Sequence, residues 1–217
     1  MIHSYIFFDT EASITTLPPL DLEQARETFV KCLEQFPDIR FRAYATLAFK
    51  SNTRFMLHIR AATPDAIQLL VRDLLHTELG IHLRVTYTLM GSTRSSQYNP
   101  KHPPKEAVWD IDHRYLVVYP FTKTIEWHLM PYEQRRSIMK AHVDVGRTYS
   151  DKISQMLLYS YGIDDHEFIV SYYMDDLEAF QTLVMEMRGT ESRRHTKNDL
   201  PIYTCIHMTL AEALSMV

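Results

Sequence analysis

The stretch that decides the fold is residues 41–59, FRAYATLAFKSNTRFMLHI. Apolar residues alternate with polar ones from Phe41 to Phe49 and again from Phe55 to Ile59, and this period of two predicts half-buried strands. Ser51-Asn52, between the two runs, is typical of a turn. We therefore expect an antiparallel hairpin at the centre of the N-terminal half.

Periodic patterns extend on both sides of this hairpin. Apolar residues at intervals of three and four indicate a helix before it, which Pro37 ends, and a helix after it, which Pro64 opens and Gly80 caps. The elements expected around the hairpin are a strand over 2–8, a helix over 21–36, a helix over 64–75 and a strand over 81–89. The order β-α-β-β-α-β is that of a ferredoxin-like unit.

The same order returns after a change of composition. Between Gly91 and Asp110 the chain is rich in Ser, Pro, Asn and Lys, which is typical of a linker. The elements expected beyond it are a strand over 115–119, a helix over 131–149, strands over 155–161 and 167–173, a helix over 175–187 and a strand over 201–208. The sequence thus predicts an α+β fold of tandem ferredoxin-like βαββαβ domains, a dimeric α+β barrel. The expected boundaries are 1–90, a linker over 91–112, and a second domain over 113–217.

Composition excludes several classes of protein. The 217 residues are 46% hydrophobic and carry a formal net charge of -4, which disfavours nucleic acid as a partner. No stretch approaches the roughly 18 apolar residues of a membrane helix, and the apolar run at the N-terminus lacks the basic flank of a signal peptide. The only cysteines, Cys32 and Cys205, form no CxxC pair. We expect a soluble cytoplasmic protein that does not bind a membrane.

The residues with the clearest chemistry lie in the second half. Tyr119-Pro120-Phe121-Thr122-Lys123 precedes Glu126-Trp127, and His142 follows on the face of a helix that also carries Ile138, Met139 and Val145. A histidine on an apolar face is either an ordinary core residue or an axial ligand of haem iron, and the spacing alone leaves both open. Together these residues suit a site for an anionic redox macrocycle.

In combination, the motifs resemble the chlorite dismutase-like haem protein family. The resemblance covers essentially all of residues 113–208, whereas the first half shares only the order of elements. The motifs that carry it are Tyr119-Pro120-Phe121-Thr122-Lys123, Glu126-Trp127, Arg135-Arg136, Met139, His142, residues 159–168 (YSYGIDDHEF), Asp175-Asp176-Leu177, Met187-Arg188-Gly189-Thr190-Glu191, Thr196 and Pro201-Ile202-Tyr203-Thr204. The duplicated βαββαβ order fits the known fold of that family.

The resemblance implies a role for each residue of the motif. His142 matches the proximal iron ligand, and Glu191 the carboxylate that can reach its ring. Lys123 and Trp127 match residues beside the porphyrin propionates. Gln155 stands thirteen residues after the histidine, where chlorite dismutases proper carry arginine.

Glutamine at that position matches the decarboxylase branch, in which hydrogen peroxide drives the conversion of iron coproporphyrin III (coprohaem) to haem b. Tyr119 then stands where that branch has a redox-active tyrosine. In this reaction a phenoxyl radical removes hydrogen from a propionate, and loss of CO2 leaves a vinyl group. The family resemblance also implies a homopentamer.

Two positions depart from the pattern of this branch. Arg193 replaces a serine that contacts a propionate, and its charge offers a different contact. His102 matches a distal histidine that helps to deprotonate peroxide in actinobacterial decarboxylases, although an ordinary loop histidine fits equally well. The alternatives are a haem peroxidase or chlorite-degrading enzyme on the same scaffold, and a non-enzymatic haem carrier or sensor. A carrier would need His142 but neither Tyr119 nor Lys123.

Overall fold

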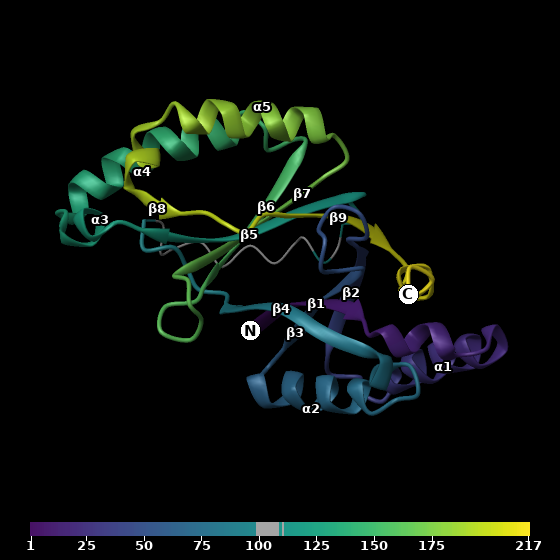
Figure 1. The fold of residues 1–217 in the computed structure, drawn as a ribbon. Coiled ribbons are helices and arrows are strands. Elements are labelled where there is room, and N and C mark those ends of the chain that lie inside the picture. Colours follow the sequence, from purple (N-terminus) through teal and green to yellow (C-terminus); the bar gives the residue numbers. More distant parts are fainter. Residues whose placement is uncertain (99–108, 110) are drawn as a thin grey trace. The chain divides into compact units, whose positions relative to one another are not determined.

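A computed structural model describes residues 1–98, 109 and 111–217 (Figure 1). The chain divides into two compact units, which we describe separately. Unit 1 comprises Met1–Ser92 together with Cys205–Val217, and unit 2 comprises Thr93–Thr204. The C-terminal segment thus packs with the first unit, whereas the sequence pattern had assigned it to the second domain.

Unit 1 contains an antiparallel sheet in the order β4-β1-β3-β2-β9. Its strands are β1 (Ile2–Thr10), β2 (Arg40–Ala45), β3 (Phe55–Ala61), β4 (Leu83–Ser92) and β9 (Tyr203–Met208), of which all but the first two residues belong to this unit. The expected hairpin is present as β2 and β3, with Ala43 opposite Leu57. However, β2 ends at Ala45 rather than at Phe49, because Thr46 turns inward to a 2.9 Å hydrogen bond with Thr53 and Ala48 adopts a φ of 68°.

The helices of unit 1 close its core. They are α1 (Pro19–Glu34) and α2 (Pro64–Leu75), with the short α6 (Leu210–Leu214) and the 3-10 segments η1 (Ala12–Thr16) and η2 (Gly80–His82). Phe29, Leu70 and Leu74 are fully buried against the sheet residues Phe55 and Leu57. The expectation that Gly80 caps α2 is wrong: His76 is the C-cap, and Gly80 is required because a side chain there would collide with the backbone of α2.

Unit 2 repeats the plan with β5 (Tyr115–Lys123), β6 (Ile153–Tyr159), β7 (Phe168–Met174) and the short β8 (Thr196–Asn198). These strands form an antiparallel sheet in the order β6-β7-β5-β8. Its helices are α3 (Ile125–Leu129), α4 (Tyr132–Arg147), α5 (Leu177–Arg188) and the 3-10 segment η4 (Glu191–His195). In Figure 1, α4 and α5 lie next to each other on the same side of this sheet.

The two units fill the space under their helices differently. In unit 1, α1 and α2 each contribute several buried apolar residues, whereas α4 in unit 2 contains none. Ile138, Met139, His142 and Val145 are nevertheless the half-buried face of α4, as its amphipathic pattern predicts. A helix whose apolar face stays partly exposed indicates open space beneath it.

The α+β fold with duplicated βαββαβ order is confirmed. Each half contains the expected strand-helix-hairpin-helix succession, and in unit 1 the neighbouring order β4-β1-β3-β2 is that of a ferredoxin-like sheet. Among the described residues, no helix is long and apolar enough to cross a membrane.

Candidate active site

A cavity of about 1190 Å³ lies within unit 2. Strand periodicity explains its floor, because alternate residues of neighbouring strands point to one face of a sheet. Tyr119 and Phe121 of β5, Gln155 of β6, and Phe168 and Tyr172 of β7 all line it, and the register sets Phe121 opposite Phe168 and Gln155 opposite Tyr172. Helix α4 and the segment after α5 provide the remaining walls.

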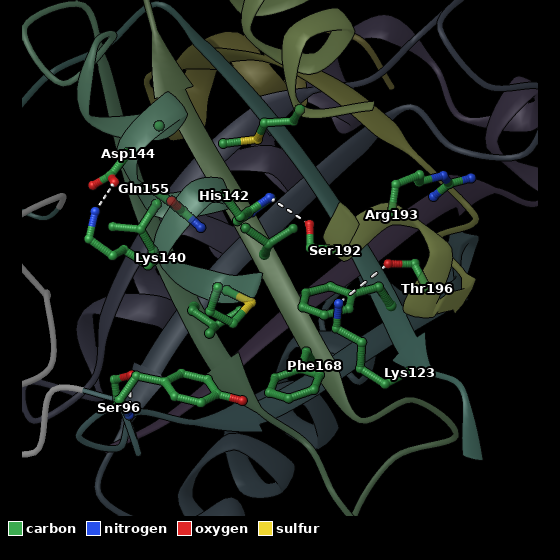
Figure 2. Close-up of a pocket in the computed structure, with 18 of the residues that line it drawn as sticks. Ser96, Lys123, Lys140, His142, Asp144, Gln155, Phe168, Ser192, Arg193 and Thr196 are labelled. Atoms are coloured by element: carbon green, nitrogen blue, oxygen red, sulfur yellow. Dashed lines mark hydrogen bonds and ion pairs between the residues drawn. The ribbon is translucent and has the colours of Figure 1, made fainter. Parts of the chain in front are cut away.

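His142 projects from α4 into the wall of this cavity, as Figure 2 shows. Its Nδ1 lies 3.0 Å from the hydroxyl of the buried Ser192, which leaves Nε2 as the ring nitrogen available to a metal ion. Burial lowers the pKa of the imidazole below its usual value, and the positive charge of Lys123 lowers it further. The ring is therefore held in its neutral form, which is the form that binds metals.

Glu191 does not occupy the place that the family pattern suggested. Its side chain is exposed and lies 3.6 Å from Arg194, while the neighbouring Ser192 contacts the histidine ring. The short 3-10 helix explains the difference, since successive residues of such a turn point in different directions, and Ser192 is the buried residue of this helix. In this structure, the partner of His142 is a hydroxyl group instead of a carboxylate.

Lys123 and Trp127 lie together at one side of the cavity. The Lys123 ammonium group is 4.7 Å from the centre of the buried Trp127 ring and 3.5 Å from Thr196 Oγ1. Helix α3 holds the tryptophan there, because the Thr124 side chain accepts a hydrogen bond from its backbone N–H. Burial lowers the pKa of Lys123 to about 8, with a further lowering by Arg193 that the Glu167 carboxylate opposes.

Tyr119 is half-buried and lies against a second tyrosine. Its ring centre is 6.1 Å from that of Tyr172, and the two hydroxyl groups are within hydrogen-bonding reach. Burial raises the pKa of both phenols above the usual value, and the interaction with Tyr172 partly offsets the rise for Tyr119. Both phenols therefore keep their hydroxyl hydrogen at physiological pH.

Charged side chains gather on the described cavity lining, and the cationic ones are in excess. The cationic residues are Lys123, Arg136, Lys140, Arg147, Arg188 and Arg193, and the acidic ones are Glu133, Asp144 and Asp199. Asp199 pairs with Arg188 at 2.9 Å and with Arg193 at 2.7 Å, and Asp144 similarly pairs with two basic residues of α4. Such a lining favours an anionic ligand.

The structure brings together most of the residues that the sequence singled out. Tyr119, Lys123, Trp127, His142, Gln155 and Arg193 all line the cavity. His102 lies outside the described residues. Ser192 and Tyr172 were not identified from the sequence. For Tyr172 the alternation of β7 was an available signal, since it places Tyr172 on the same face of the sheet as Val170.

Comparison with known proteins identifies the family. Residues 22–208 match the family model described as chlorite dismutase. The chain belongs to the chlorite dismutase family. Members of this family are haem enzymes, and the match spans both units of the chain.

Among curated members of the chlorite dismutase family, a coproheme decarboxylase from Mycolicibacterium smegmatis is 26% identical over 185 residues, or 85% of this chain and 80% of that protein. A coproheme decarboxylase from Staphylococcus saprophyticus is 35% identical over 109 residues, or 48% of this chain and 44% of that protein. Both are named for the decarboxylation of coprohaem.

Solved structures agree on the fold. Chlorite dismutase from Candidatus Nitrospira defluvii in complex with imidazole superposes with a TM-score of 0.90 and 22% identity, over 99% of this chain and 93% of that one. A single-residue variant of the same enzyme gives a TM-score of 0.91 at 22% identity, over 99% and 93% of the two chains. At this identity the likeness concerns architecture alone.

Proposed function

We propose that this protein is a coprohaem decarboxylase, which uses hydrogen peroxide to convert iron coproporphyrin III to haem b. The observation that carries the proposal is the placement of a neutral histidine, a lysine and a tyrosine around one cavity with an excess of cationic residues. Relatives named coproheme decarboxylase, one matched over 85% of this chain, support it.

The cavity suits an iron porphyrin with several carboxylate groups. Its volume of about 1190 Å³ exceeds the roughly 300–1,000 Å³ of ordinary small-molecule sites. His142 would bind the iron through Nε2, and apolar walls such as Leu157 and Val170 would contact the ring. Lys123 and Arg193 would receive propionates, because a macrocycle with four carboxylate groups can engage more than one cation.

The reaction balances for each propionate. A propionate side chain, one hydrogen peroxide and one proton give a vinyl side chain, one CO2 and two water molecules. Two electrons leave the side chain and reduce the peroxide. Since haem b differs from its precursor by two such conversions, two peroxides are consumed for each macrocycle.

The protein residues would divide this work. The bound iron porphyrin supplies the redox chemistry with peroxide. Tyr119 would lose its hydroxyl hydrogen and then, as a phenoxyl radical, take a hydrogen atom from the reacting propionate. Lys123 would hold the carboxylate beside it, since a positioned group raises the rate only if the reacting atoms stay in contact. Gln155 offers an uncharged amide at the cavity wall, where a peroxide molecule could be hydrogen-bonded.

A tyrosine substitution tests this assignment. We expect Tyr119→Phe to bind coprohaem and to react with peroxide but to form no haem b, because it loses the O–H group with almost no change of volume. Tyr115→Phe on the same strand is the matched control, since Tyr115 does not belong to the described cavity lining, and it should convert coprohaem at the parent rate.

The result also separates the competing functions. A general peroxidase or a haem carrier on this scaffold would be nearly indifferent to Tyr119→Phe. Formation of haem b by Tyr119→Phe at the parent rate would contradict the radical role of this residue. Separation of the porphyrins by chromatography measures each outcome directly.

A further inference from the structure

A chain of hydroxyl groups lies behind His142. Ser192 Oγ lies 3.0 Å from His142 Nδ1 and 3.0 Å from Thr190 Oγ1. The Thr190 hydroxyl in turn lies 2.7 Å from the carbonyl oxygen of Met187, at the C-terminal end of α5. Ser192 is only 4% exposed, so the chain runs through the interior of unit 2.

The protons of this chain can be assigned by counting. A carbonyl oxygen only accepts, so Thr190 must donate its single hydroxyl proton to Met187. Thr190 can then only accept from Ser192, whose single proton is used in that bond. Ser192 has no proton left for the imidazole, and Nδ1 of His142 must therefore be the donor.

The opposite direction makes fewer hydrogen bonds. If Ser192 donated to His142, Thr190 could donate either to Ser192 or to Met187 but not to both, and one of the three contacts would be lost. One net hydrogen bond corresponds to a population ratio of roughly two- to tenfold. Thr190 is also the N-cap of η4, yet its side chain makes no capping hydrogen bond, which is consistent with its use in this chain.

We infer that Ser192 and Thr190 are positioning residues that fix His142 as the Nδ1–H tautomer, with the lone pair of Nε2 directed to the cavity. The inference rests on the proposed function in one respect, which is that His142 is the residue that binds iron. A hydroxyl is also a weaker acceptor than a carboxylate, so the ring keeps the character of a neutral imidazole.

Thr190 gives the sharpest test, because it touches His142 only through Ser192. In Thr190→Val the Ser192 proton is released and can be donated to Nδ1, so we expect the Nε2–H tautomer to become the major form. Ser192→Ala removes the acceptor itself, and the tautomer should return to the Nε2–H form that a histidine side chain favours in water. Thr190→Ser keeps the hydroxyl group, so this variant should show the same tautomer as the parent.

The measurement is made on the metal-free protein at neutral pH. Nitrogen-15 NMR of histidine-labelled protein distinguishes protonated from unprotonated ring nitrogens, and His142→Gln identifies the signal. Thr148→Val is the matched control, because the Thr148 hydroxyl also donates to a backbone carbonyl three residues earlier but, within the described part of the chain, is not hydrogen-bonded to a group that contacts a histidine. We expect the parent and this control to be protonated on Nδ1.

A second readout is the affinity for ferric haem b. Loss of such a supporting contact typically weakens metal binding by roughly 10–100-fold, and we expect this for Ser192→Ala but not for Thr148→Val. A parent ring protonated on Nε2, or an unchanged tautomer in Thr190→Val, would overturn the inference. Failure to convert coprohaem would remove the proposed function but would leave a tautomer result of the expected kind standing.

Discussion

The low pKa of Lys123 predicts how the binding of porphyrin depends on pH. The ammonium group is largely buried, and its pKa lies at about 8 instead of the ordinary 10.5. A carboxylate bound beside it would stabilise the charged form and raise the pKa again. At a pH where Lys123 of the free protein is neutral, binding of the porphyrin is therefore coupled to uptake of a proton. The affinity for the porphyrin must then fall as the pH rises through about 8.

The size of the effect follows from the fraction of charged lysine. With a pKa of about 8, the charged fraction falls from about nine-tenths at pH 7 to about one-tenth at pH 9, which weakens binding about tenfold. A hydrogen bond to a charged group contributes about 1.5–3 kcal/mol, so the decline levels off only after a loss of roughly 10–100-fold. Lys123→Met should bind with that weaker affinity at every pH.

Fluorescence titration with metal-free coproporphyrin III measures this dependence without the ionisation of an iron-bound water. Lys197→Met is the matched control, because Lys197 is an exposed lysine on the neighbouring β8 and should leave the pH profile unchanged. A parent affinity that stays constant between pH 7 and pH 9 would refute the reasoning. A tenfold decline that persists in Lys123→Met would assign the ionising group elsewhere.

The same low pKa affects folding. Between about pH 8 and the ordinary value of 10.5, the unfolded chain binds more protons at Lys123 than the folded chain does. The free energy of unfolding therefore increases as the pH rises through that window. Denaturant unfolding of metal-free Lys123→Met should lack this gain.

Three further predictions concern the site and the assembly. His142→Ala should retain porphyrin through carboxylate contacts but lose the Fe–N(His) band in resonance Raman spectra, and a band at the parent position would contradict the assignment. Tyr172→Phe should slow the formation of haem b about fivefold, the equivalent of one hydrogen bond of about 1 kcal/mol, while an unchanged rate would remove its role beside Tyr119. Light scattering should report a homopentamer, since α3 exposes Ile125 by 73% and Leu129 by 80%, and a monomer would argue against it.

The sequence predicted those features that depend on local pattern. Alternation along the strands and helical spacing located nearly every element, and the motif from Tyr119 to His142 marked residues that the fold gathers around one cavity. One local signal was missed: Thr209 and Glu212 form a capping box that begins α6. The packing of α6 with unit 1 depends on burial of Leu214 and is not visible in local pattern.

Features that depend on contacts between distant residues were beyond sequence reasoning. Ser192 and His142 are 50 residues apart, and only the direction of the η4 turn decides that Ser192 rather than Glu191 meets the ring. The partner of Tyr119 is similarly set by strand register and side-chain orientation, which no spacing in the chain encodes. The low pKa of Lys123 arises from burial that only the folded structure creates.

The central claim is that the protein turns coprohaem into haem b, and mass spectrometry of the porphyrin after incubation with peroxide tests it most directly. We predict two successive losses, each of one CO2 and two hydrogen atoms, with one peroxide consumed for each loss and haem b as the end product. Coprohaem that returns with its mass unchanged, or that is bleached without either loss while peroxide is consumed, would contradict it.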